Sequence, residues 1–210
     1  MNKKLATDQN GRSMIEMLGV LAIVGVLSVA GIAGYSKAMG KYKINKVMDQ
    51  VSTIAANVKT MFASQGSYTD LAKGTGEGAT ATGTAISLGL LPEEMTKNST
   101  TYGINGLNGK AFVGKTKDDL AFFVIMDGLS KDACVALATS DWGGASGFRY
   151  LAISQTAIAT EPAASTVESS KTASGTGIIR PVDNATTIFS TASNADSGCS
   201  EGSAITWVFY

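Results

Sequence analysis

The longest apolar segment of the chain lies near its start. No charged residue occurs in residues 17–34, and residues 14–34 would form a helix roughly 30 Å long, about the thickness of the hydrocarbon core of a bilayer. A cleaved secretory signal has a shorter apolar segment of about 7 to 15 residues and ends in a small-x-small cleavage site. The pattern therefore predicts a helix that can span a membrane and that stays attached to the chain.

The helical pattern continues beyond this segment, where apolar residues recur mostly at steps of three and four. These residues are Met39, Tyr42, Val47, Val51, Ile54, Ala55, Val58, Met61 and Phe62. Polar residues occupy much of the other face, among them Lys37, Lys41, Asp49, Gln50, Ser52, Asn57 and Lys59. Such spacing places the apolar residues on one face of a helix. We therefore expect one continuous helix over about residues 13–63, with a lipid-like first half and an amphipathic second half.

Four lysines follow the apolar segment: Lys37, Lys41, Lys43 and Lys46. They are typical of a solvated or headgroup-facing collar just outside a membrane. We favour this interpretation over a specific contact for any of the four.

The remainder of the chain alternates apolar segments with turn residues. β-Branched and aromatic runs predict strands at residues 110–114, 120–126, 148–153, 177–182 and 204–210. A short helix is expected within residues 86–98, beginning near Pro92, and Ser130 is expected to cap another that carries Cys134. The glycine-rich residues 73–85 predict a flexible surface loop. The fold class is therefore α+β, with an antiparallel sheet packed on the long helix.

Composition argues against an enzyme and against a nucleic-acid-binding protein. Histidine is absent, and 17 basic residues balance 17 acidic ones, so the usual general base and a net attraction to phosphate are both missing. The adjacent acids Glu93 and Glu94, and likewise Asp118 and Asp119, point apart on a helix or strand and form no converging pair. We expect no catalytic residue, no metal site and no cofactor. Trp142 and Trp207 are expected in the core.

The two cysteines, Cys134 and Cys199, lie too far apart for a local zinc site or a CxxC redox pair. A disulfide in an oxidising compartment is favoured. Two unrelated buried thiols remain the alternative on spacing alone.

Glu16 is a carboxylate at the head of the apolar segment, and a carboxylate within hydrocarbon costs several kcal/mol unless it is neutralised, paired or close to water. The sequence around it, "MNKKLATDQNG" followed by "RSMIE", resembles the class III signal of type IV prepilins. The resemblance implies cleavage between Gly11 and Arg12 by a prepilin peptidase, with possible methylation of the new amino terminus at Arg12. It also implies that Glu16 pairs with the amino terminus of a neighbouring subunit and sets the axial register. The alternative is an interfacial or first-turn acid favoured by the helix dipole.

A second resemblance lies in the "FFVIMDGLSKDACVAL" segment, which is similar to the strand, turn and cysteine-bearing helix of type IVb pilins. It implies a type IV pilin fold with a disulfide between Cys134 and Cys199. The implied organisation is a cleaved leader at 1–11 and a long helix at 12–63, whose residues 14–34 serve membrane insertion and assembly. A globular head follows at 64–210, with an αβ-loop at about 64–119 and a disulfide-bounded D-region at 134–199.

The function implied by these resemblances is that of a structural subunit of a type IV pilus, used for adhesion, aggregation or related surface functions. The implied partners are copies of the chain, the prepilin peptidase, and the inner-membrane assembly machinery with its ATPase. The chain would lie in the bacterial inner membrane with a periplasmic head before assembly, and in an extracellular pilus afterwards. A minor pilin or a type II secretion pseudopilin is one alternative. A singly membrane-anchored periplasmic binding module is an alternative of another class.

Overall fold

The computed structural model describes residues 14–72, 80–97, 99–142, 147–163, 167–168, 178–181 and 198–210. The chain divides into two compact units, Met1–Lys41 and Tyr42–Tyr210. From here on we call the second unit the head; it includes the end of the long helix as well as residues 64–210. The expected leader at 1–11, including Gly11, and the expected new amino terminus at Arg12 lie outside the described residues.

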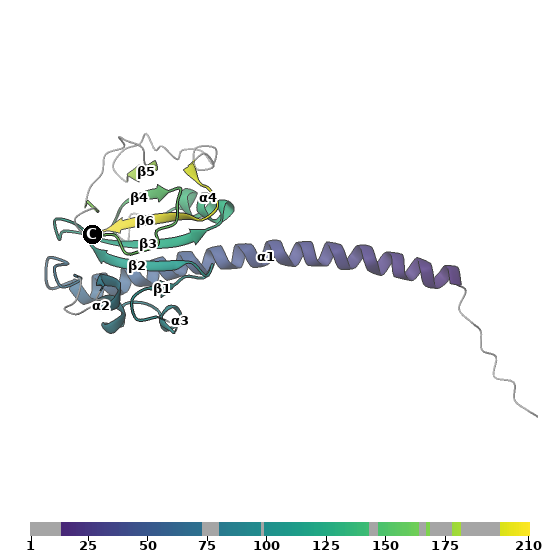
Figure 1. Ribbon diagram of the computed structural model, residues 1–210, viewed down its shortest axis with the longest axis horizontal. Helices are drawn as coiled ribbons and strands as arrows, with labels where there is room; N and C mark the ends of the chain where they lie inside the picture. Colours follow the sequence, from purple (N-terminus) through teal and green to yellow (C-terminus); the bar gives the residue numbers. More distant parts are fainter. Residues whose placement is uncertain are drawn as a thin grey trace, which may run out of the picture. The chain divides into compact units, whose positions relative to one another are not determined.

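Helix α1 spans Met14–Phe62 without interruption (Figure 1), which confirms the predicted long helix to within one residue at each end. Its buried residues all belong to the head: Val47, Gln50, Val51, Ile54, Ala55, Val58 and Phe62. The predicted apolar face is therefore largely confirmed, but it was wrong for Tyr42 and Met61, which are exposed. The assignment of Gln50 to the polar face was also wrong, since this side chain is buried.

Where the structure describes the head, its strands form one sheet, in which every pair of neighbouring strands is antiparallel. Its strands are β1 (Gly103–Ile104), β2 (Lys110–Lys115), β3 (Phe122–Leu129), β4 (Phe148–Ser154), β5 (Ile178–Pro181) and β6 (Ser203–Phe209). They lie in the order β1-β2-β3-β6-β4-β5, so the last strand of the chain is inserted between β3 and β4. All five predicted strands are confirmed. The two-residue β1 was missed, and β3 ends three residues later than predicted.

The described residues of the head also form three short helices: α2 (Ala81–Ser87), α3 (Glu93–Thr96) and α4 (Lys131–Thr139). The helices expected after Pro92 and after Ser130 are confirmed as α3 and α4, and the Ser130 hydroxyl accepts from the amide of Ala133. The predicted surface loop at 73–85 was wrong at its end, because α2 begins at Ala81. Thr80 caps that helix by accepting a hydrogen bond from the amide of Gly83.

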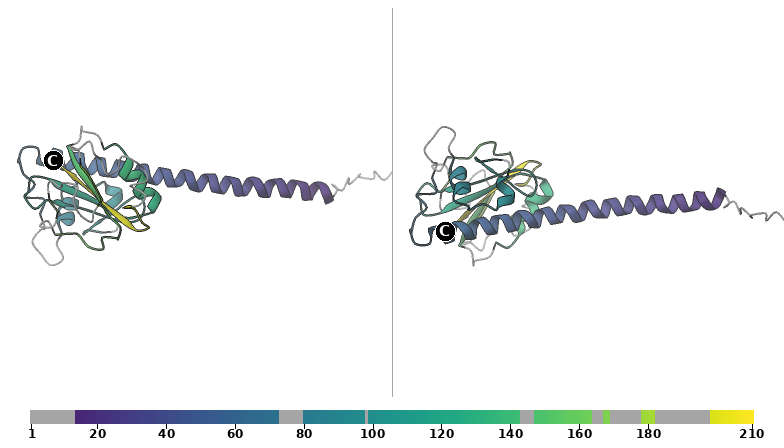
Figure 2. Two further views of the ribbon diagram at one scale, coloured as in Figure 1. Left: turned by 90° about the horizontal axis from the view of Figure 1, so that it is seen from above. Right: turned by 90° about the horizontal axis from the view of Figure 1, so that it is seen from below.

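Both faces of the sheet are covered by apolar clusters. Successive side chains of a strand point to opposite faces, so neighbouring residues of one strand belong to different clusters. Phe122, Val124 and Trp207 belong to the large cluster that also contains the buried residues of α1. Phe123 and Ile125 belong to a second cluster. Figure 2 shows the sheet from above and from below, with the second half of α1 running along it. The uninterrupted "FFVIM" of β3 therefore reflects a strand that is buried on both faces.

Candidate functional site

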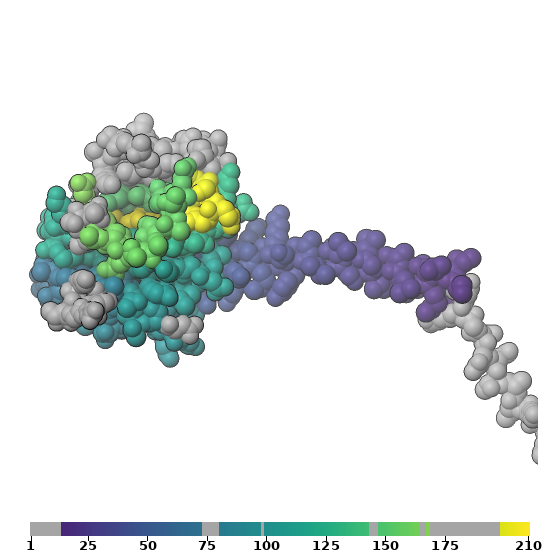
Figure 3. All heavy atoms as spheres, in the orientation of Figure 1, coloured from purple at the N-terminus to yellow at the C-terminus, as the bar shows by residue number. Residues whose placement is uncertain are grey.

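The first half of α1 presents an exposed apolar surface. Met14, Ile15 and Ile32 are 84%, 80% and 71% exposed, respectively, and the most apolar window of the helix has a mean hydropathy of 2.3 with none of it buried (Figure 3). By length and composition, α1 can cross a membrane. A continuous apolar surface of this extent needs lipid or other chains to cover it.

Glu16 lies in the first turn of α1 and is exposed. A carboxylate there is favoured by the positive end of the helix dipole. Among the described residues, none donates a hydrogen bond or forms an ion pair with this carboxylate. The structure thus places Glu16 at the head of the apolar surface. Its expected partner, the amino terminus at Arg12 of a neighbouring copy, lies outside what the structure describes.

Within the head, Gln50 joins three elements. Its side-chain Nε2 donates to Oε1 of Glu94 in α3 at 2.8 Å, and its Oε1 accepts from the amide of Gly106 after β1 at 3.0 Å. The side chain is only 4% exposed, so an amide that lost either partner would leave a buried polar group unpaired. Gln50 therefore fixes α3 and the turn after β1 against α1.

Lys46 adds an ion pair to the same junction. Its Nζ lies 3.1 Å from Oε2 of Glu94. Two hydrogen bonds, the larger effect from Gln50 and the smaller from Lys46, hold the pKa of Glu94 below its ordinary value. The prediction of a solvated collar was therefore wrong for Lys46, because α3 brings an acid from elsewhere in the chain to this face of α1.

A disulfide joins Cys134 in α4 to Cys199 just before β6, with Cα atoms 5.8 Å apart. Both cysteines are buried in the large core cluster. The amide of Lys131 at the start of α4 also donates to the side chain of Glu201 at 3.2 Å. The favoured disulfide is thus confirmed, and it closes the chain across the predicted D-region.

The adjacent acids found in the sequence make separate local contacts. Glu94 belongs to the Gln50 junction, whereas Asp119 pairs with Lys115 and Asp118 accepts from the Thr116 hydroxyl at 2.8 Å. In the described part of the chain, no group of three or more His, Cys, Asp or Glu side chains could hold a metal ion.

The indole side chains of Trp142 and Trp207 pack edge to face, with ring centroids 5.0 Å apart. They are 8% and 0% exposed. The prediction that both tryptophans belong to the core is confirmed.

The long helix, the sheet and the disulfide occur together in a known protein family. A family model described as PilS N terminal matches residues 41–193, more than half of the chain. The chain belongs to the PilS family of type IV pilins. This pilin matches no curated protein sequence.

Among solved structures, the pilin is similar to TcpA, a type IV pilin from Vibrio cholerae El Tor biotype. The match covers 80% of this chain and 99% of TcpA, with 12% sequence identity and a TM-score of 0.53. At this sequence identity, the structural match shows a shared fold and nothing more. The long helix, the antiparallel sheet and the disulfide therefore form a type IVb-like pilin fold.

Two polar side chains that hold this pilin together, those of Gln50 and Glu161, were not predicted from the sequence. A signal for Gln50 was present, since it lies three residues after Val47 and four before Ile54, within the buried stripe. Glu161 had no comparable signal, because its partners, the amides of Ala81 and Thr82, lie about 80 residues earlier in the chain.

Proposed function

We propose that this pilin is made as a prepilin and becomes the structural subunit of a type IVb-like pilus. Residues 14–34 would hold it in the inner membrane, with the head in the periplasm, and a prepilin peptidase would cleave between Gly11 and Arg12. Arg12 would then carry the free amino terminus, with or without a methyl group. The observation that carries the proposal is the exposed apolar first half of α1, continuous with a second half that buries one face in a folded head.

Assembly follows from the cost of exposing that surface. A chain that leaves the bilayer must bury the apolar half of α1 against other copies, at about 25 cal/mol for each Å² removed from water. Apolar packing of this kind is weakly directional, so a polar contact is needed to select one stagger. Glu16 would provide it by pairing with the amino terminus of a neighbour, because a stagger that leaves this carboxylate unpaired among apolar helices is penalised.

The proposed partners follow from this route. The inner-membrane assembly machinery and its ATPase would extract the subunit and add it to the filament. The αβ-loop at about 64–119 and the D-region at 134–199 would then lie on the outside, where they could serve adhesion, aggregation or related surface functions. The Cys134–Cys199 disulfide supports residence of the head in an oxidising compartment.

Replacement of Glu16 by alanine in cells that carry the assembly system tests the proposal. Glu16→Ala should insert into the membrane at the wild-type level, because it removes only a charge from an apolar segment. Its yield in filaments sheared from the cell surface should fall by about tenfold or more, as expected for loss of a buried ion-pair partner.

Glu93→Ala, which removes an exposed carboxylate in α3, is the matched control and should assemble normally. Wild-type filament yield from Glu16→Ala would refute the register role. Absence of filaments from the wild type, with the full-length chain retained in membranes, would favour a singly anchored binding module instead.

A further inference from the structure

The segment that follows β4, residues 155–163, crosses the face of the sheet that carries the second apolar cluster; we call it the strap. Most of its residues are exposed, and it forms part of the green surface of the head in Figure 3. Ile158 is half-buried and packs against that cluster, which includes Phe112 and Ile125. The strap therefore covers an apolar face while burying little of itself.

Side chains from distant elements hold the strap in place. The hydroxyl of Ser200 donates to the carbonyl of Gln155 at 2.5 Å, and a carboxylate oxygen of Asp127 accepts from the amide of Ile158 at 3.2 Å. Lys110 Nζ donates to the carbonyl of Ala159 at 2.7 Å. Attachment through individual side chains is typical of segments that open locally at lower cost than a strand in the middle of a sheet.

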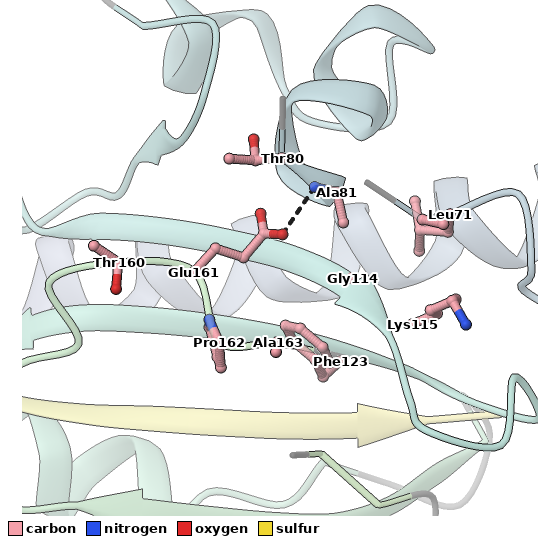
Figure 4. Close-up of a pocket in the computed structure, with 11 residues that line it drawn as sticks. Leu71, Thr80, Ala81, Gly114, Lys115, Phe123, Thr160, Glu161, Pro162 and Ala163 are labelled. Atoms are coloured by element: carbon pink, nitrogen blue, oxygen red, sulfur yellow. Dashed lines mark hydrogen bonds between the residues drawn. The ribbon is translucent and has the colours of Figure 1, made fainter. Parts of the chain in front are cut away.

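Glu161 makes the most extensive of these attachments (Figure 4). Its Oε1 accepts from the amide of Ala81 at 2.8 Å, and its Oε2 accepts from the amide and the hydroxyl of Thr82 at 2.8 and 2.5 Å. Amides in the first turn of a helix lack intrahelical acceptors, and hydrogen bonds to a carboxylate are stronger than neutral ones. One side chain of the strap thus satisfies the first two amides of α2.

Thr82 extends this connection to the edge of the sheet. Its hydroxyl accepts from the amide of Val113 in β2 at 2.9 Å and lies 3.2 Å from the carbonyl of the same residue. Strand β1 pairs with β2 only at Lys110 and Ala111, so Val113 lies beyond the end of β1. A strand edge with open backbone groups is a site for pairing with another chain. Thr82 closes that edge, and Glu161 holds Thr82.

A cavity of about 390 Å³ lies between the strap and α2. Leu71, Phe123 and Pro162 are among the residues that line it, with Glu161 at its boundary (Figure 4). Because side chains of the described residues leave this space open, the hydrogen bonds of Glu161 matter more to the contact between strap and α2 than they would in a close-packed interface.

We propose that the strap and α2 form a latch that Glu161 closes, and that its release uncovers the edge of β2 at Val113 while the rest of the sheet stays folded. The latch connects a segment of the predicted D-region to a helix of the predicted αβ-loop. The proposal rests on contacts within the head and does not depend on filament assembly.

Residue-resolved hydrogen exchange of the full-length chain in detergent micelles tests this latch. In Glu161→Ala, the amides of Ala81, Thr82 and Val113 should exchange about tenfold faster or more, together with that of Ile158 in the strap. Glu161→Gln keeps one acceptor oxygen and should give a smaller increase at the same positions. The amide exchange rates of Val124 in β3 and Trp207 in β6 should not change.

As a control, Glu168→Gln removes an exposed carboxylate that follows the strap in the chain, before β5. It should leave all of these amide exchange rates unchanged. An increase in Glu161→Ala that is equally large in β3 and β6 would overturn the proposal, because Glu161 would then stabilise the whole head. Unchanged rates at Thr82 and Val113 would also overturn it. If Glu161→Ala does not accumulate as folded protein, the same outcomes in Glu161→Gln decide the question.

Discussion

At the scale of single residues, Gln50 shows how one buried amide can hold a junction. Replacing Gln50 by alanine leaves the amide of Gly106 without its acceptor and Oε1 of Glu94 without the donor that Gln50 supplies. We expect the free energy of unfolding to fall by about 2 kcal/mol. Urea unfolding of the full chain in detergent, followed by tryptophan fluorescence, measures the loss. Asn45→Ala, an exposed change on the same helix, should cost less than about 0.5 kcal/mol; equal losses in the two variants would contradict this role for Gln50.

The same junction predicts a dependence on pH. In the folded state the pKa of Glu94 is lowered from its ordinary value of 4.5, mainly by the hydrogen bond from Gln50 and next by that from Lys46. A lowered folded-state pKa means that the stabilisation is complete above the unfolded-state pKa and is lost as the pH falls through the folded-state pKa. Because the side chain of Glu94 is 46% exposed, the contribution should be below about 1 kcal/mol.

Glu94→Gln should therefore unfold at a lower urea concentration than the wild type at pH 7, and the difference should shrink below pH 4.5. The control, Glu93→Gln, changes an exposed neighbouring carboxylate. Its difference from the wild type in the urea concentration of unfolding should not depend on pH in this way. A difference for Glu94→Gln that stays constant from pH 7 to pH 3 would show that the charge of Glu94 is not the cause.

At the scale of elements, a helix or strand could be predicted from the sequence where its own pattern of apolar and polar residues marks it. The period of α1 and the apolar runs of β2, β3, β4 and β6 mark these elements because burial on one or both faces decides their side chains. Helix α2 carries no such signal. Apart from Ile86, its seven residues are only Ala, Gly, Ser and Thr, and its first amides depend on Thr80 and on the distant Glu161. Elements completed by a distant side chain are therefore not predictable from their own sequence.

The disulfide between α4 and the segment that precedes β6 gives the prediction at this scale. Cross-linking residues 65 positions apart constrains the unfolded chain, so reduction should lower the free energy of unfolding by about 4 kcal/mol in the chain-entropy model. Urea unfolding with and without a thiol reductant measures the difference. A Cys134→Ala, Cys199→Ala double variant should be as unstable as the reduced wild type and should not respond to the reductant. A reductant effect of the same size in that variant would exclude the disulfide as the cause.

At the scale of the whole molecule, the chain combines a folded head with an apolar helical segment whose side chains are exposed. The resemblance of residues 11–16 and of the segment around Cys134 to type IV pilins led to the correct family and fold. The details of the head, such as the Gln50 junction and the Glu161 latch, depend on contacts between segments far apart in the sequence. The central claim that remains to be tested is processing and assembly of the chain through α1.

Mass spectrometry of filaments sheared from the surface of cells that express the chain is the most direct test. The account predicts a subunit that begins at Arg12, with or without an added methyl group, and a mass lower by two hydrogens because Cys134 and Cys199 are joined. Absence of the chain from the sheared filaments, with only the full-length form beginning at Met1 in the membrane fraction, would contradict it.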